Sequence, residues 1–87
     1  VVRDYKVALK LFSEAADKGD AWALNNLGSL YEMGWGTTKD VVKAREFYRA
    51  AIAKGNQMAQ ANLSRLDGMQ ANAGQAGAPA PAQTQGN

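Results

Sequence analysis

The sequence predicts an all-α fold, an alpha-alpha superhelix of four antiparallel helices that is followed by a disordered C-terminal tail. Apolar residues recur at helical spacing, and no stretch alternates apolar and polar residues as a strand does. The helical pattern repeats itself, and a glycine lies wherever one helix has to end. These three observations favour stacked helical hairpins.

The repeat has a period of 36 residues, the shift that brings Asp4 onto Asp40. Matches at this shift fall on apolar helix positions and on turn glycines, which is typical of stacked supersecondary units. The identical pairs include Ala8 and Ala44, Ala15 and Ala51, Gly19 and Gly55, Ala23 and Ala59, Asn26 and Asn62, Leu27 and Leu63, Leu30 and Leu66, and Met33 and Met69.

The first and third predicted helices, residues 5–18 and 40–54, share one amphipathic pattern. Asp4 and Asp40 stand before them, where a carboxylate can accept the unpaired amide hydrogens of the first turn. The core-facing residues are Tyr5, Ala8, Leu11, Phe12 and Ala15, then Val41, Ala44, Phe47, Tyr48 and Ala51.

The second and fourth predicted helices, residues 20–33 and 56–69, each follow a short turn, "KGD" or "KGN". The glycine ends one helix and Asp20 or Asn56 begins the next, so paired helices must run antiparallel. Gly28 is expected to let two helices approach closely. The core-facing residues are Ala23, Leu27, Leu30 and Tyr31, then Ala59, Leu63 and Leu66.

The stretch "YEMGWGTTKD", residues 31–40, superficially resembles a phosphate-binding loop. Such a loop follows a strand and has further glycines or a lysine at fixed spacing, whereas this one follows a helix. We therefore predict a turn in which Gly34 ends a helix and Gly36 lets the backbone double back. Trp35 is expected to fold back over the helix pair.

Composition excludes several function classes. Ten Lys and Arg against eight Asp and Glu leave a net charge of +2, too small and too evenly spread for a nucleic-acid surface. The sequence has neither Cys nor His, which removes thiol nucleophiles, imidazole bases and the usual zinc ligands, so we expect no metal and no cofactor. No apolar run approaches the ~20 residues of a membrane span. We expect a soluble protein, in the cytoplasm or in a bacterial periplasm or secreted.

Residues 20–56 contain a series of small, aromatic and turn residues: Leu27-Gly28, Tyr31, Gly34, Gly36, Asp40, Lys43-Ala44, Phe47-Tyr48, Ala50-Ala51 and Gly55. With this series they resemble a Sel1-like repeat, and Ser64 and Asp67 depart from the pattern one repeat later. The period and the glycine loop distinguish the pattern from the tetratricopeptide repeat of about 34 residues, which is similar in fold. On this resemblance we divide the chain into a partial repeat (1–19), a full repeat (20–55), a degenerate last repeat (56–69) and a disordered tail (70–87), and expect further repeats before it.

The resemblance implies a non-catalytic scaffold or adaptor that binds other proteins or peptides on the concave face of stacked hairpins, and it suggests a bacterial origin. No small-molecule substrate is expected. By analogy with the tetratricopeptide arrangement, the candidate partner-binding residues are Trp22, Asn25, Ser29, Glu32, Met58 and Arg65, with Ala61 beside them.

Structural interpretations compete with these candidates. Trp22 and Met58 are as readily explained by packing on a neighbouring repeat. Glu32 and Arg65 can be solvated charges on the helix surface. The recurrence of Asn26 and Asn62 can reflect hydrogen bonds to an adjoining loop. Two other functions stay open: a structural spacer within a larger bacterial envelope or secreted protein, and part of a cell-wall-acting enzyme. The second is disfavoured because nothing forces the helical carboxylates of Glu14, Asp17, Glu32 and Glu46 into a facing pair.

Overall fold

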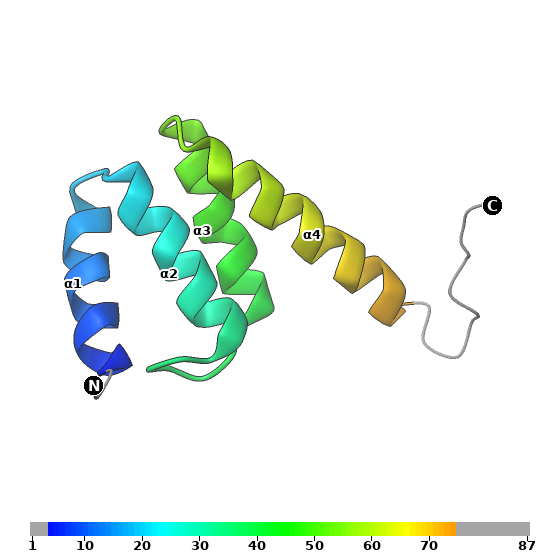
Figure 1. Ribbon diagram of the computed structural model, residues 1–87, viewed down its shortest axis with the longest axis horizontal. Coiled ribbons are helices and arrows are strands. Elements are labelled where there is room, and N and C mark those ends of the chain that lie inside the picture. Colours follow the sequence, from blue (N-terminus) through cyan, green and yellow to red (C-terminus); the bar gives the residue numbers. More distant parts are fainter. Residues whose placement is uncertain (1–3, 75–87) are drawn as a thin grey trace.

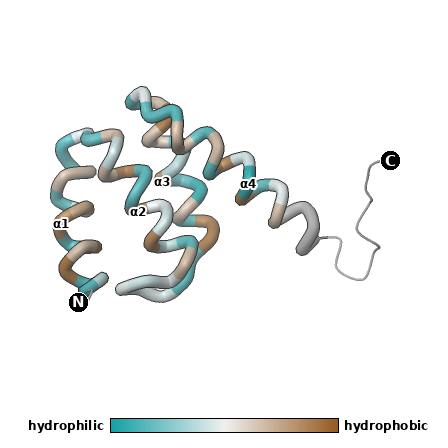
Figure 2. Tube along the Cα trace, viewed as in Figure 1, coloured by the Kyte–Doolittle hydropathy of each residue, from teal (hydrophilic) through white to brown (hydrophobic). Residues whose placement is uncertain are grey.

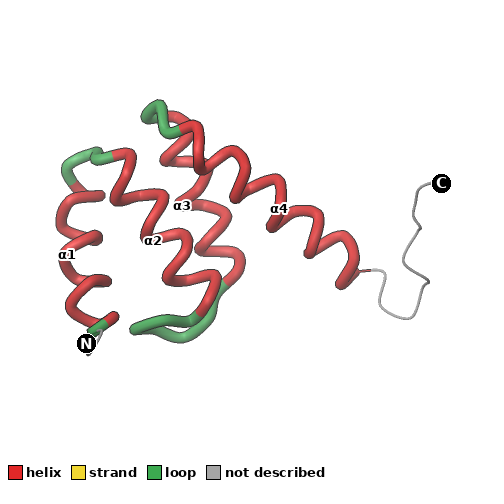
Figure 3. Tube along the Cα trace, viewed as in Figure 1, coloured by secondary structure: helices red, strands yellow, loops and turns green. Residues whose placement is uncertain are grey.

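The computed structural model describes residues 4–74, with the backbone alone for residues 70–74. Four helices fill this range: α1 (Tyr5–Asp17), α2 (Ala21–Met33), α3 (Val41–Ala53) and α4 (Gln57–Gly74) (Figure 3). Each helix packs against the next along the chain, and the C-terminal part of α4 extends beyond the other three helices (Figure 1). No strand occurs among residues 4–74, so the predicted all-α helical-repeat fold is confirmed.

Each helix begins where a capping side chain was predicted. The carboxylate of Asp4 accepts the backbone N–H groups of Lys6 and Val7, and those of Asp20 and Asp40 each accept the N–H three residues on. Asn56 caps α4 in the same way, its Oδ1 lying 3.1 Å from the amide nitrogen of Ala59. A polar residue one position before each helix therefore satisfies part of its first turn.

The loop between α2 and α3 is a turn that packs on the start of α1 (Figure 1). Gly34 ends α2 in the left-handed conformation, as predicted. Gly36 also has a positive φ of 79°, and a Cβ atom there would lie 2.5 Å from the carbonyl oxygen of Tyr5. Trp35 stacks on the ring of Tyr5 with centroids 5.0 Å apart. Gly36 thus lets the loop approach the start of α1, where a side chain would not fit.

Helix α4 is longer than the sequence predicted. It was expected to end at residue 69, with a disordered tail from residue 70, but the helix continues to Gly74. Residues 70–74 read "QANAG", and Gln and Ala are good helix formers that can extend a helix beyond its last packed turn. Residues 75–87 of the predicted tail lie outside the described residues.

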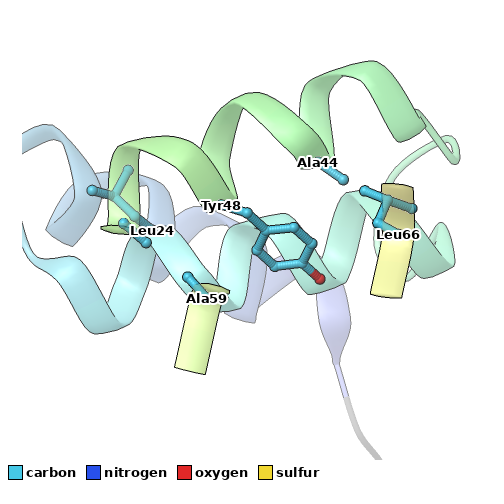
Figure 4. Packing of buried hydrophobic residues seen from close by; sticks show 6 residues of the cluster. Leu24, Ala44, Tyr48, Ala59 and Leu66 are labelled. Carbon is cyan, nitrogen blue, oxygen red and sulfur yellow. The ribbon is translucent and has the colours of Figure 1, made fainter. Parts of the chain in front are cut away.

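The core lies between α2, α3 and α4, and its largest fully buried side chain is Tyr48 (Figure 4). A Cβ atom on Gly28 would lie 2.5 Å from the ring of Tyr48, which confirms the close helix approach predicted there. Phe47 is only half-buried and stacks on Tyr31 with centroids 5.4 Å apart. The other buried apolar residues are Ala23, Leu24, Leu27, Leu30, Ala44, Ala51, Ala59 and Leu66.

Helix α1 is covered less completely than α3, although the two occupy equivalent positions in the repeat. No residue of α1 is fully buried, and its expected core positions Tyr5, Ala8, Phe12 and Ala15 are half-buried. The expectation that Leu11 faces the core is wrong, because its side chain is exposed on the outer face of α1. Their counterparts Ala44, Tyr48 and Ala51 are entirely inaccessible. Helix α3 packs against α2 and α4, whereas α1 packs against α2 alone among the helices described.

Candidate functional site

The six candidate residues lie on α2 and α4, the two first helices of the predicted hairpins, and two of them are prominently exposed. Trp22 is 60% exposed and Met58, one repeat later, is 66% exposed. Trp22 also packs on Phe12 of α1 in a T-shaped arrangement, with ring centroids 5.4 Å apart. The tryptophan therefore covers the neighbouring helix with one side and leaves the other accessible.

Two methionines extend the exposed apolar surface. Met33 lies eleven residues after Trp22, and Met69 lies eleven after Met58, which returns each to the same face of its helix three turns on. Met33 and Met69 are 48% and 51% exposed. We call Trp22, Met33, Met58 and Met69 the α2/α4 face.

A line of polar contacts joins α2 to α4. Asn62 donates from Nδ2 to Oδ1 of Asn25, at 2.9 Å, and Asn25 is buried. At one end of the helices, Nδ2 of Asn56 lies 3.4 Å from the carbonyl oxygen of Ala21. The expectation that Asn62 bonds an adjoining loop is wrong, because its partner stands on the preceding first helix.

The strongest contact in this line is made by Glu32, which is 4% exposed. Arg65 donates to both carboxylate oxygens, through Nη1 to Oε2 and through Nη2 to Oε1 at 2.8 Å. The Tyr48 hydroxyl donates to Oε1 at 2.7 Å and lies 3.2 Å from the hydroxyl of Ser29. The interpretation of Glu32 as a solvated charge is therefore wrong. It is buried because a forked guanidinium and a phenol satisfy its oxygens.

This network fixes the charge of Glu32. The hydrogen bonds from Arg65 lower the pKa of the carboxyl below its usual 4.5, against the opposing effect of burial, and the bond from Tyr48 lowers it further. Burial raises the pKa of Tyr48 to about 12, and the Arg65 pKa is raised, chiefly by its hydrogen bonds to Glu32. At neutral pH the group is a carboxylate, a neutral phenol and a guanidinium.

The structure thus separates the candidates into two sets. Trp22 and Met58 offer accessible apolar surface, whereas Asn25 and Glu32 are engaged in contacts between the helices. Ser29 is half-buried beside Tyr48, and the side chain of Arg65 is 44% exposed although paired.

The sequence analysis missed Met33 and Met69 as surface residues. Their recurrence at the repeat period is a signal that could have placed them beside Trp22 and Met58.

Within residues 4–74, no group of acidic side chains is arranged to hold a metal ion, and no pocket is present. None of the helices described is long and apolar enough to cross a membrane. Glu32 is held ionised by Arg65, which leaves it no proton to give as a general acid near neutral pH.

Antiparallel helices joined by glycine turns, with equivalent side chains recurring one repeat apart, define an α-helical repeat protein. The model of the Sel1 repeat family matches residues 1–20 and 23–56. The chain belongs to this family, as its resemblance to a Sel1-like repeat predicted.

Two curated relatives match parts of the chain. DAP3-binding cell death enhancer 1 of Rattus norvegicus is 40% identical over 68 residues, which are 78% of this chain and 13% of that protein. The ERAD-associated E3 ubiquitin-protein ligase component HRD3 of Candida glabrata is 45% identical over 47 residues, 54% of this chain and 6% of that protein. The matches thus span a small part of either relative. No solved structure matches the chain.

Both relatives are eukaryotic proteins, so the predicted bacterial origin remains a prediction.

Proposed function

We propose that this chain is a non-catalytic module that binds another protein or a peptide through the α2/α4 face. The observation that carries the proposal is the recurrence of large, accessible apolar side chains at equivalent positions of the two first helices, Trp22 with Met58 and Met33 with Met69. Exposed aromatic and methionine side chains are enriched at protein interfaces. Because α2 and α4 each carry two such side chains, an extended partner can contact the face at more than one point.

The rigidity of the scaffold beneath this face supports the proposal. Asn25, Glu32 and Arg65, expected as contacts, instead fix α2 and α4 to one another. Trp22 and Met58 would therefore lie at a fixed separation before the partner binds, which lowers the entropic cost of binding. The partly exposed guanidinium of Arg65, between Met58 and Met69 in sequence, adds a polar edge. We accordingly propose Trp22 and Met58 as the main contacts and Arg65 as an accessory one.

The family also supports binding over catalysis, since stacked repeats generate an extended surface for macromolecular partners. The rat relative is named for binding another protein, and the yeast relative as a component of a ligase. A structural spacer is the second candidate function, because the network around Glu32 fixes the distance between helices whether or not a partner is bound.

Affinity capture combined with crosslinking would test the proposal. The intact parent protein would be compared with a Trp22→Ala, Met58→Ala double variant, followed by quantitative mass spectrometry. A partner that crosslinks to α2 or α4 and is lost from the double variant by on the order of tenfold or more would support it.

Val42→Ala is the matched control, because Val42 is 62% exposed and lies on α3, outside the α2/α4 face. Circular dichroism would verify that all three proteins keep the same helix content. If the captured proteins and the crosslinks are identical for the double variant and the wild type, the α2/α4 face is not the binding surface and the spacer function is favoured.

A further inference from the structure

All three methionines of the chain lie on the α2/α4 face. Met33, Met58 and Met69 are 48%, 66% and 51% exposed. Hydrophobic residues recur along the helices (Figure 2), but the buried apolar side chains among the described residues are those of alanine, leucine and tyrosine. Methionine, which often fills irregular gaps in protein cores, is therefore confined in this chain to the accessible surface.

An exposed methionine is open to oxidation at its sulfur atom. The chain has no cysteine, so no thiol of its own competes for a peroxide. A lone pair of the sulfur attacks one oxygen of hydrogen peroxide, and the O–O bond breaks as the S–O bond forms. The departing hydroxide takes the proton of the transferred oxygen and leaves as water. The sulfur loses two electrons, the peroxide gains them, and the product is a polar sulfoxide that dedicated reductases convert back to the thioether.

Arg65 is placed to bind such a sulfoxide at Met69. Its Nη1 lies 3.6 Å from the sulfur of Met69, one helical turn further along α4. A thioether is a weak acceptor, whereas the more negative oxygen of a sulfoxide accepts a stronger hydrogen bond from a cation. The guanidinium has five N–H donors, and its two bonds to Glu32 leave donors for this oxygen. Oxidation of Met69 would therefore occupy the exposed side of Arg65 without displacing Glu32.

The core does not depend on these three side chains. Its largest fully buried residues are Tyr48, Leu27 and Leu66, which have no sulfur atom. Oxidation turns an apolar side chain into a polar one, and this change is tolerated where the side chain is already in water. Peroxide would therefore alter the surface of the α2/α4 face and leave the packing of the helices as it is.

We propose that Met33, Met58 and Met69 are sites of reversible oxidation by hydrogen peroxide, and that their sulfoxides switch off the binding of a partner to the α2/α4 face. The proposal rests on the proposed function, because it concerns the regulation of the same face. Met58 is the principal site, since it is the most exposed of the three and lies one repeat from Trp22. Its sulfoxide removes an apolar contact, and that of Met69 removes the free edge of Arg65.

The modification sites can be tested without a partner. The intact parent protein would be treated with hydrogen peroxide and mapped by peptide mass spectrometry, with amide hydrogen exchange measured across α1 to α4. We expect one added oxygen on each methionine, with Met58 oxidised first, and unchanged exchange in all four helices. A Met58 that resists peroxide while the helices stay folded, or faster exchange throughout the oxidised helices, would overturn the proposal.

The effect on binding can be tested by the affinity capture and crosslinking described above. The untreated protein would be compared with the peroxide-treated protein, and with treated protein that methionine sulfoxide reductases A and B have then reduced. Capture through α2 and α4 should fall on the order of tenfold on oxidation and return on reduction. A loss that the reductases do not reverse would contradict the proposal.

A variant with Met33→Leu, Met58→Leu and Met69→Leu is the matched control, because leucine keeps a similar apolar volume without a sulfur atom. Compared with its own untreated sample, its capture should not respond to peroxide. If the Trp22→Ala, Met58→Ala variant loses no partner, the proposed function fails, and the mass mapping still decides the oxidation sites. If that variant loses the partner but a sulfoxide at Met58 does not, or if the leucine variant responds to peroxide as strongly as the wild type, the oxidation proposal alone is wrong.

Discussion

The two end helices of the described structure differ in the surface that they turn away from the core. On α1 that surface is apolar, with Val7 and Leu11 exposed. On α4 the positions equivalent to Leu24, Gly28 and Tyr31, with which α2 packs on α3, are polar. They are Gln60, Ser64 and Asp67.

These polar residues of α4 interact with one another and with α3. Nε2 of Gln60 donates to the hydroxyl of Ser64 at 3.2 Å, and Arg45 pairs with Asp67 at 2.8 Å. This face therefore lacks the apolar side chains and the glycine with which α2 packs on α3. The comparison teaches that a few side chains decide whether the same helical framework exposes apolar or polar surface at its end.

The largest expected effect compares how much a buried ring of α3 and the equivalent ring of α1 contribute to stability. Tyr48→Ala should cost about 3–5 kcal/mol, because it removes a fully buried ring and the phenol that serves Glu32. The equivalent change Phe12→Ala should cost clearly less, because Phe12 is only half-buried in α1. Urea unfolding followed by circular dichroism measures both. Equal losses would show that α1 is as fully packed as α3.

The second effect tests the α4 end. Gly28→Leu should destabilise the fold by an amount at the upper end of the about 1–3 kcal/mol typical of overpacking, since its Cβ atom would already clash with the ring of Tyr48. Ser64→Leu places the same side chain at the equivalent, exposed position of α4 and should change stability by less than about 0.5 kcal/mol. Thermal melts of the two variants give the comparison. A severe loss in Ser64→Leu would mean that this face of α4 is not open.

A smaller effect separates two arginines that both hold α4. Arg65→Ala leaves the buried carboxylate of Glu32 without its main partner and should cost about 1–3 kcal/mol. Arg45→Ala removes a pair with the more exposed Asp67 and should cost at most about 1 kcal/mol. Chemical denaturation of each single variant measures the two losses. A larger loss for Arg45→Ala than for Arg65→Ala would contradict the conclusion that the Arg65–Glu32 pair contributes more to the packing of α4 than the Arg45–Asp67 pair does.

The smallest effect is the pH dependence that Glu32 contributes. Because its pKa in the folded state lies below the usual 4.5, its contribution is complete above about pH 4.5 and is lost as the pH falls through the folded-state value. The free energy of unfolding of the wild type minus that of Glu32→Gln, measured across this range, should decline toward acid. A difference that stays constant with pH would show that Glu32 titrates normally in the fold.

The helices, their caps and most of the core followed from local patterns in the sequence. Asp20, Gly28 and Tyr48 each sit where the repeat and ordinary helix chemistry predicted. The burial of Glu32 did not follow, because it depends on Arg65, which lies 33 positions further along the chain on another helix. Neither residue has a like counterpart at the repeat period, where Gly68 and Ser29 stand. The contact between Glu32 and Arg65 is therefore formed by two residues that differ from their repeat counterparts, so the repeat pattern did not predict it.

Both tryptophans of the chain rest on side chains of α1, Trp22 on Phe12 and Trp35 on Tyr5. Their emission accordingly reports the detachment of the first helix, whereas the aromatic rings between α2 and α3 belong to tyrosine and phenylalanine. If α1 dissociates before the other helices unfold, tryptophan fluorescence will change at a lower denaturant concentration than the helical circular dichroism signal does. Tryptophan fluorescence is thus an intrinsic probe of how stably α1 is packed on the other helices.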